Sequence, residues 1–336
     1  LLQIRPEGIY LPAADLFLDP VRPVKRAAIS HGHADHARAG HGAVIATAET
    51  LAIMQVRYGD EPEQRRRALS FGEVIDVGTG KSSVRLWLAP AGHVLGSAQI
   101  VIEQNGTRLV YSGDYKPRAD ATCAAFEPVV SDIFITEATF GLPVFRHPPA
   151  RDEIAKLLAA QQQFPDRAIV VGTYALGKAQ RLIKELRLAG YTAPIHLHGA
   201  LLPLCRLYQD HDVDLGALEP ATAGERGKAR ADLKGQIVLA PPSAIADRWA
   251  RRLPEPLIAM ASGWMRVKQR ARQRGVELPL ILSDHADWDE LLATIEATGA
   301  GEIWVTHGRE EALVHACAKQ GIAARALALV GYEEDG

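Results

Sequence analysis

The sequence predicts an α/β protein, in which a part dominated by strands is followed by a part where strands and helices alternate. Over the first 145 residues, short apolar runs of strand length stand between Gly, Pro, Asn and Asp residues, which commonly separate the strands of a sheet. From about Pro148, apolar residues at helical spacing alternate with such runs, and this alternation favours a parallel sheet.

The expected elements follow from these runs in chain order. In the first part we expect one helix at 48–59 among the strands. The expected strands cover 8–11, 27–30, 43–47, 83–90, 98–103, 107–114 and 132–139. Beyond them we expect helices at 150–164, 176–190, 202–211, 288–299 and 309–321, and strands at 167–174, 194–199, 235–242, 257–264, 278–285, 302–308 and 324–329. The stretch 218–235 has the least core-like composition and is expected to be a mobile loop.

Composition narrows the class of protein. With 47% hydrophobic residues in 336 and a net charge of −2, the chain can bury a sizeable core but has no global positive field to attract nucleic acid. Its three cysteines are far apart and form no Cys-x-x-Cys pair, which favours a reducing compartment. We recognise no signal peptide and no apolar stretch of membrane-spanning length, and therefore expect a cytoplasmic protein without a membrane partner.

Three of the 12 histidines lie within residues 30–37, directly behind an apolar run. In an extended chain the two-residue spacing of His31 and His33 turns both rings to the same side, and Asp35 and His36 follow beyond a turn. This arrangement offers two ligands to one metal ion and two to its neighbour. Nitrogen and carboxylate ligands suit Zn²⁺ or Mn²⁺, although a solvated histidine-rich loop is the alternative interpretation.

Three more strand ends carry a ligand-type residue beside a glycine, namely His93, Asp114 and His307. Glycine lets the backbone turn sharply and approach a crowded centre. A single histidine at a strand end is commonly structural. Four such sites together favour a metal centre over a solvated loop.

Several motifs resemble a known family. "HGHADH", "AGH" and "SGD" are similar to the ligand series of the metallo-β-lactamase fold. "TEATFG", "SDHADWDEL" and "VTHGREE" resemble motifs A, B and C of its β-CASP branch of nucleic-acid-processing nucleases. Within that branch, the motif sequences are most similar to those of bacterial ligase-associated DNA exonucleases. The resemblance covers nearly the whole chain. It implies an αββα metallo-β-lactamase sandwich formed by 1–145 and 276–336, with an inserted α/β β-CASP domain at 146–275.

The resemblance also implies roles for individual residues. It assigns His31, His33 and His93 to one metal, Asp35, His36 and His307 to a second, and Asp114 to a bridge between them. The implied cofactors are two divalent ions, zinc or manganese, and Asp19 is the implied support of the metal loop. Many relatives have threonine in place of Gly32, but we expect no loss of ligation.

The implied chemistry is phosphodiester hydrolysis by a hydroxide that bridges the two metals. We expect His285 to bind the phosphate or protonate the leaving oxygen, and Glu137 to orient His285 or a ligand histidine. Asp284 either supports His285 or forms a salt bridge at a strand end. The predicted catalytic residues are Asp35, Asp114, Glu137 and His285.

Contacts with substrate are expected in the inserted domain. Gly177 and Lys178 begin a helix after a strand, where free N–H groups bind phosphate well. We also expect contacts from His198, in preference to His196, and from Ser262 and Gly263 in "ASGWM". The basic run 266–274 either follows a nucleic-acid backbone or is a solvated helix face. Arg65–Arg67 are expected at the surface, and Trp264 and Tyr174 either stack on bases or are buried.

These features predict a metal-dependent nuclease that hydrolyses DNA, with an exonuclease in DNA repair as the favoured activity. A functional association with a DNA ligase and a helicase is implied by resemblance alone. A β-CASP ribonuclease that processes RNA ends is the first alternative. The inserted domain argues against a small-substrate metallohydrolase, and the complete ligand set argues against an inactive scaffold subunit.

Overall fold

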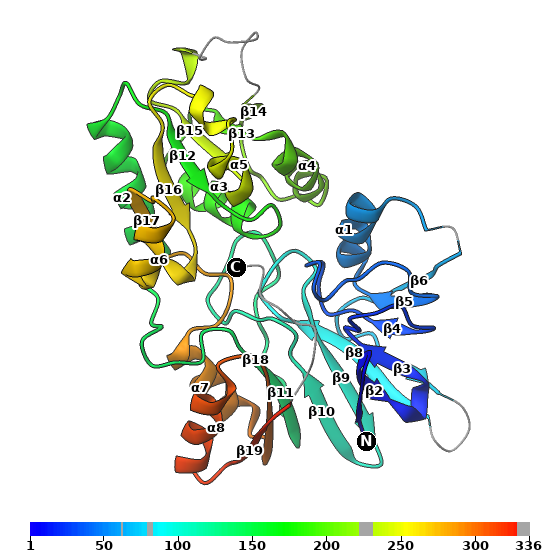
Figure 1. Cartoon of the computed structure of the whole chain (residues 1–336). Coiled ribbons are helices and arrows are strands. Elements are labelled where there is room, and N and C mark those ends of the chain that lie inside the picture. The colour runs from blue at the N-terminus through cyan, green and yellow to red at the C-terminus, as the bar shows by residue number, and fades with distance from the viewer. Residues whose placement is uncertain (62, 79–82, 222–230, 328–336) are drawn as a thin grey trace. The chain divides into compact units, whose positions relative to one another are not determined.

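The computed structural model describes residues 1–61, 63–78, 83–221 and 231–327, and the chain divides into two compact units (Figure 1). Unit 1 comprises Leu1–Arg146 and His285–Gly336, and unit 2 comprises His147–Asp284. The return to unit 1 therefore occurs at residue 285 rather than at the expected 276, because Leu278–Leu280 pairs with a strand of unit 2. Residues 222–230 of the expected loop 218–235 lie outside the described residues.

Unit 1 contains two mixed sheets. The first sheet has the strand order β1 (Gln3–Arg5), β2 (Gly8–Leu11), β3 (Leu16–Leu18), β4 (Ala27–Ala28), β5 (Ala43–Ala46) and β6 (Arg65–Ala68). The second sheet has the order β19 (Ala323–Ala326), β18 (Glu302–Gly308), β11 (Ile133–Ala138), β10 (Thr107–Tyr111), β9 (Ala98–Gln104), β8 (Val84–Pro90) and β7 (Ile75–Val77).

The two sheets of unit 1 pack face to face, and each has helices on its other face. Because strand side chains alternate, Ile100 and Ile102 of β9 join the core between the sheets, whereas Val101 joins a separate core against the helices α7 (Trp288–Thr298) and α8 (Glu310–Lys319). On the first sheet, α1 (Ala48–Tyr58) completes the layers. The αββα sandwich predicted for this part of the chain is confirmed.

Unit 2 is built on one sheet whose neighbouring strands all run parallel. Its order is β14 (Leu218–Pro220), β13 (Ile195–Leu197), β15 (Ile237–Ala240), β12 (Ile169–Gly172), β16 (Leu257–Ala261) and β17 (Leu278–Leu280). Its helices are α2 (Ala150–Gln163), α3 (Lys178–Leu188), α4 (Leu202–Asp210), α5 (Pro242–Ala246) and α6 (Lys268–Gln273). The central strands β12 and β15 are wholly buried, as expected for a parallel sheet covered on both faces.

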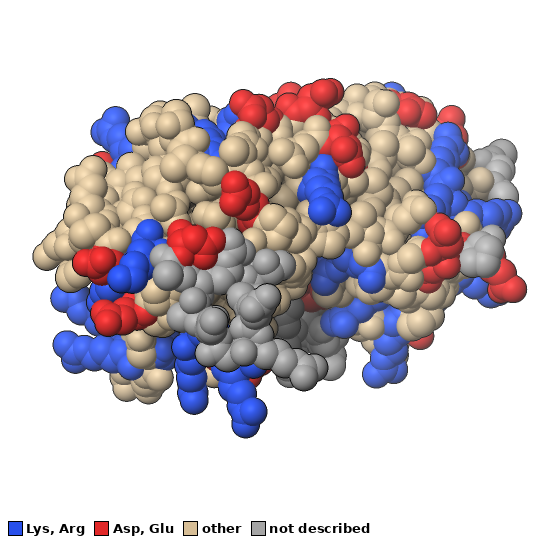
Figure 2. All heavy atoms as spheres, turned by 90° about the horizontal axis from the view of Figure 1, so that it is seen from above, with Lys and Arg blue, Asp and Glu red and all other residues tan. Residues whose placement is uncertain are grey.

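Charge is mixed over the surface. On the face in Figure 2, Lys and Arg side chains lie among Asp and Glu side chains rather than in one continuous patch, in agreement with the net charge of −2. Among the described residues, no helix has both the length and the apolar character needed to cross a membrane.

Candidate metal centre

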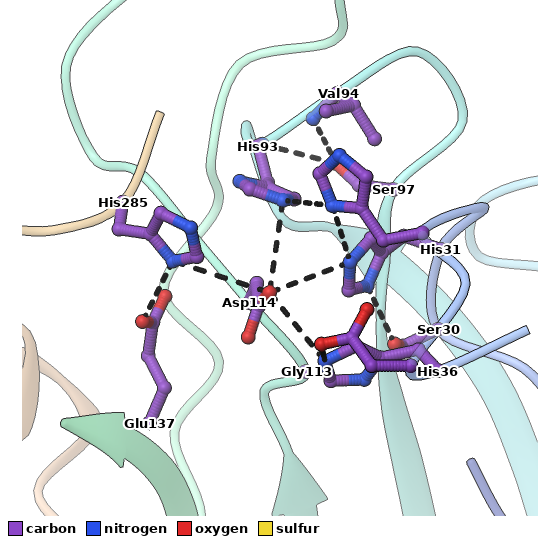
Figure 3. Close-up of polar contacts among 12 residues, drawn as sticks. Ser30, His31, His36, His93, Val94, Ser97, Gly113, Asp114, Glu137 and His285 are labelled. Carbon is purple, nitrogen blue, oxygen red and sulfur yellow. Dashed lines mark hydrogen bonds and ion pairs between the residues drawn. The ribbon is translucent and has the colours of Figure 1, made fainter. Parts of the chain in front are cut away.

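The predicted ligands of unit 1 converge where several of its strands end, and Figure 3 shows His31, His36 and His93 around Asp114. The histidine loop, residues 30–37, follows β4, while His93 follows β8 and Asp114 follows β10. Strands β10, β11 and β18 are mutually parallel, so their carboxyl ends meet at one edge of the second sheet. That edge also carries Glu137 of β11 and His307 of β18.

Three imidazoles and one carboxylate form the first cluster. His33 Nδ1 lies 3.0 Å from both His31 Nε2 and His93 Nε2. Asp114 Oδ2 lies 3.4 Å from His31 Nε2 and 3.7 Å from His93 Nε2. A tetrahedral Zn²⁺ ion with ligands at about 2.0–2.1 Å separates neighbouring ligand atoms by about 3.4 Å. The four donor atoms therefore fit a tetrahedral divalent ion.

A second cluster shares the same carboxylate oxygen. Asp114 Oδ2 also lies 3.4 Å from His36 Nε2, and ligand atoms of His36, Asp114 and His307 all lie within 4.8 Å of one another. The Asp35 carboxylate is 3.6 Å from His36 Nε2. The structure thus brings together all seven predicted ligands, with Asp114 between two groups that could each hold a metal ion.

A β-bulge turns His307 toward this centre. Glu137 of β11 pairs with Thr306, whereas Ala138 pairs with Gly308, so His307 is the extra residue of β18. Its φ of 58° lies in the left-handed region, which non-glycine residues seldom adopt. Bulges commonly redirect a side chain next to a functional site.

Asp19 orients two of the histidines, one directly and one through Ser30. Its carboxylate accepts hydrogen bonds from the Ser30 backbone N–H and hydroxyl, and Oδ2 lies 2.7 Å from His36 Nδ1. The Ser30 hydroxyl in turn lies 3.0 Å from His31 Nδ1. With Nδ1 engaged, both rings direct Nε2 toward Asp114, the arrangement by which carboxylates commonly orient metal-binding histidines.

Helix α1 holds the histidine loop in place, a contribution that no sequence pattern indicated. Arg57 donates from Nη1 to the Gly32 carbonyl at 2.7 Å, and the Tyr58 hydroxyl donates to the Ala37 carbonyl at 2.7 Å. A Cβ atom at Gly32 would lie 2.5 Å from Ile53 Cγ2, inside the buried face of α1. The close approach of loop and helix explains why glycine occupies this position.

Glu137 and His285 form a pair beside the first cluster. Glu137 is buried, and its Oε2 lies 2.8 Å from His285 Nδ1, while its Oε1 accepts a hydrogen bond from the Tyr115 backbone N–H. His285 Nδ1 is 4.0 Å from Asp114 Oδ2. Of the two roles considered for Glu137, the geometry places it on His285 rather than on a ligand histidine.

Burial and neighbouring charges divide the histidines of the metal-free centre into two kinds. Burial lowers the pKa of His33 to about 3 and that of His307 to about 4, and it holds the pKa of His93 well below the usual value. Burial also acts to lower the pKa of His36, but the Asp114 and Asp35 carboxylates outweigh it and raise that pKa well above the usual range.

The Asp114 carboxylate itself stays ionised. Burial acts to raise its pKa, but the adjacent His36 and His285 rings outweigh it and hold the pKa well below the usual value. His33, His93 and His307 are thus neutral and Asp114 is ionised, as a divalent metal requires of its ligands, whereas the protonated His36 ring would have to release its proton to bind one.

The residues expected to contact substrate lie in unit 2. Lys178 is buried, with Nζ 2.8 Å from Asp284 Oδ2, so this ion pair engages at least one of the three N–H donors that were expected to bind phosphate. Asp284 also lies 3.3 Å from Arg181 Nη1, which fits the salt-bridge alternative for this aspartate. Gly177 is the residue before α3.

The other expected contact residues have local partners. His198 is half-buried, accepts a hydrogen bond from the Ala200 backbone N–H, and packs its ring edge on Trp249. Ser262 accepts a hydrogen bond from the Trp264 N–H, and Gly263 is buried. In the basic run 266–274, the Arg270 guanidinium lies 4.1 Å from the centre of the Trp264 ring.

Comparisons with known proteins agree with this geometry. Residues 8–172 match the Metallo-beta-lactamase superfamily. A probable DNA ligase from Opitutus terrae is 29% identical over 95% of this chain and 30% of its own length. A ribonuclease from Thermus thermophilus is 29% identical over 57% of this chain and 47% of its own length, and endoribonuclease ysh-1 of Neurospora crassa is 30% identical over 46% and 22%.

The chain spans less than half the length of each of these relatives. A crystal structure of a protein of unknown function from Enterococcus faecalis has a TM-score of 0.59 and 16% identity, covering 91% of this chain and 79% of that one. At this identity the likeness supports the fold alone.

Proposed function

The chain contains a metallo-beta-lactamase superfamily domain, and from this premise we propose that it is a metal-dependent phosphodiesterase of the β-CASP type that hydrolyses nucleic acid. The observation that carries the proposal is the shared Asp114 oxygen, which lies 3.4 Å from a histidine of each cluster. Two-metal centres of this kind are common in phosphatases and nucleases.

Two divalent ions, zinc or manganese, held by His31, His33, His93, Asp114, Asp35, His36 and His307 would polarise the phosphate oxygens and lower the pKa of a water molecule. Asp19 fixes the orientation of His36 and, through Ser30, of His31. Because Glu137 accepts from His285 Nδ1, we assign the contact with substrate to the Nε2 atom of His285. From there it binds the phosphate or delivers a proton to the leaving oxygen.

We favour DNA over RNA as the substrate, and an exonuclease in DNA repair as the activity. Support comes from the Opitutus terrae probable DNA ligase, whose similarity extends over 95% of this chain. The ligase relative also motivates a functional association with a DNA ligase and helicase. The two ribonuclease relatives favour RNA, but they align with only 57% and 46% of the chain.

Digestion of end-labelled single-stranded DNA, duplex DNA and RNA tests both levels of the proposal. Reactions contain Mn²⁺ or Zn²⁺, and an Asp114→Ala variant serves as the control. We expect DNA to be shortened stepwise from an end and the variant to be inactive. RNA cleaved far faster than DNA would overturn the substrate assignment, and no cleavage of any nucleic acid would overturn the nuclease.

A pair of histidine variants separates metal binding from proton transfer. We expect His285→Ala to retain its metal content but lose about 10²–10⁴-fold in turnover, the usual contribution of a positioned acid or base. We expect His307→Ala to lose metal, measured by elemental analysis after dialysis. Full metal occupancy in His307→Ala would contradict the ligand assignment.

A further inference from the structure

Arg118 connects two loops of unit 1 that carry site residues. The first loop runs from Asp114 to Arg118, and the second from His285 to Asp287, where α7 begins. Arg118 donates from Nη2 to Asp287 Oδ2 and from Nε to Glu290 Oε1. The contacts join residues 169 and 172 positions apart in the chain.

The carboxylates that Arg118 binds also form the capping box of α7. Asp287 Oδ1 accepts from the Glu290 N–H at 3.1 Å, and Glu290 Oε2 accepts from the Asp287 N–H at 2.9 Å. Each carboxylate thus uses one oxygen for the helix start and the other for Arg118. Asp287 is 3% exposed and Glu290 16% exposed as side chains, so without the guanidinium two poorly hydrated carboxylates would face each other.

His285 lies two residues before Asp287, in the segment that leads into α7. The Ala286 N–H donates to the Tyr115 carbonyl at 2.7 Å, and Glu137 contacts both the Tyr115 N–H and His285 Nδ1. His285 is therefore held on two sides. Glu137 contacts its ring, and Arg118 contacts Asp287, two residues later in the chain. Asp287 is only two residues from His285 in the chain, so the position of Asp287 limits the positions that His285 can take.

We propose that Arg118 is a positioning residue that sets the place of His285 relative to Asp114, by holding the start of α7 against the Asp114 loop. This inference rests on the proposed function of the same site. The guanidinium is suited to the task because its planar fork of N–H groups contacts both carboxylates at once in a fixed geometry, whereas the donors of an ammonium group have no such fixed spacing.

The chain offers a matched control on the same helix. Arg146 Nε lies 2.7 Å from Asp289 Oδ2, also in the first turn of α7, but both side chains are 58% exposed. Exposed pairs of this kind contribute little to stability. Arg146→Met therefore removes the same charge beside the same helix start without loosening the two loops.

The first test compares Arg118→Met, Arg118→Lys and Arg146→Met in steady-state hydrolysis. We expect Arg118→Met to lower kcat at least tenfold while KM and metal content stay within twofold, Arg118→Lys to fall between it and the parent protein, and Arg146→Met to stay within twofold. Equal kcat in Arg118→Met and Arg146→Met would overturn the inference. Should Arg118→Met fail to fold, Arg118→Lys carries the same comparison.

A second measurement does not depend on activity. Diethylpyrocarbonate labelling of the metal-free proteins, read by peptide mass spectrometry, reports the accessibility of His285, with His198 as the internal reference. We expect labelling of His285 to be at least threefold faster in Arg118→Met and unchanged in Arg146→Met. An unchanged labelling rate of His285 in Arg118→Met would overturn the inference. Because labelling requires no activity, it tests the position of His285 even if the parent protein cleaves no nucleic acid.

Discussion

Two buried carboxylates, Asp19 and Glu137, each hold a histidine by its Nδ1 atom. The two histidine rings lie in different places, so the same contact at Nδ1 has a different consequence for each. His36 directs Nε2 at Asp114, where we propose a metal ion, while His285 is 22% exposed, as the proposed contact with substrate requires. On the proposed function, the same local interaction orients one histidine to bind a metal and another to exchange a proton.

Gly32 provides a prediction at the scale of one atom. We expect Gly32→Ala to destabilise the protein by about 1–3 kcal/mol, the usual cost of overpacking a core, because the new Cβ would lie 2.5 Å from Ile53 Cγ2. The backbone is not the cause, since Gly32 is absent from the residues with positive φ. Urea unfolding measures the free-energy change.

Combining Gly32→Ala with Ile53→Ala tests whether the contact with Ile53 causes the loss of stability. Ile53→Ala removes Cγ2 and leaves only the Cβ at 3.0 Å, so adding Gly32→Ala there should cost less than in the parent protein, although Ile53→Ala alone costs about 2–5 kcal/mol. Strictly additive costs would show that the contact is not responsible. Threonine, which the family resemblance suggests at this position, would fit here only with a smaller residue at Ile53.

At the scale of elements, the ends of strands could be predicted from the sequence, but irregularities within strands could not. Apolar runs mark the strands, and rare ligand-type residues directly after them mark one edge of a sheet, so the positions of His93, Asp114 and His307 could be predicted. The bulge at His307 could not, because it arises from a register shift between β11 and β18. Register depends on both strands together, and neither sequence alone encodes it.

The bulge yields the next prediction. Gly308 has a φ of 86°, and a Cβ there would lie 2.2 Å from the Ala138 carbonyl oxygen. We expect Gly308→Ala to displace β18, move His307, and reduce the bound metal from two ions toward one. Elemental analysis measures the stoichiometry. Gly321→Ala is the control, since Gly321 has a φ of 75° with nothing within 4 Å of its added Cβ, and unchanged metal content in Gly308→Ala would contradict the role of the bulge.

At the scale of the whole molecule, the two-part organisation could be predicted because unit 1 and unit 2 differ in pattern. Alternating strands and helices indicate a parallel sheet, whereas mixed short strands indicate the sandwich. The boundary at residue 285 could not be located, because β17 reads equally well as a strand of either unit. Contacts between distant segments, such as Arg118 with Asp287, likewise leave no local pattern in the sequence.

Acidification of the metal-free protein tests the charge balance of the assembled centre. The pKa values of His33, His307 and His93 lie below the usual 6.5 in the folded state, at about 3, about 4 and well below 6.5. Between pH 6.5 and 5 the unfolded chain therefore binds protons that the folded chain does not, and the free energy of unfolding falls as the pH falls. Each histidine contributes at most about 1.4 kcal/mol per pH unit.

The other groups do not reverse this trend. The raised pKa of His36 gives a stabilisation that is fully present below pH 6.5, and the lowered pKa values of Asp114 and Asp35 give one that is lost only near pH 4 and below. Urea unfolding in a chelator at pH 6.5 and 5.0 measures the difference, and His33→Asn should show a smaller one because it removes one of the three titrating rings. Equal stability at the two pH values would show that these histidines are not held neutral by burial in the folded protein.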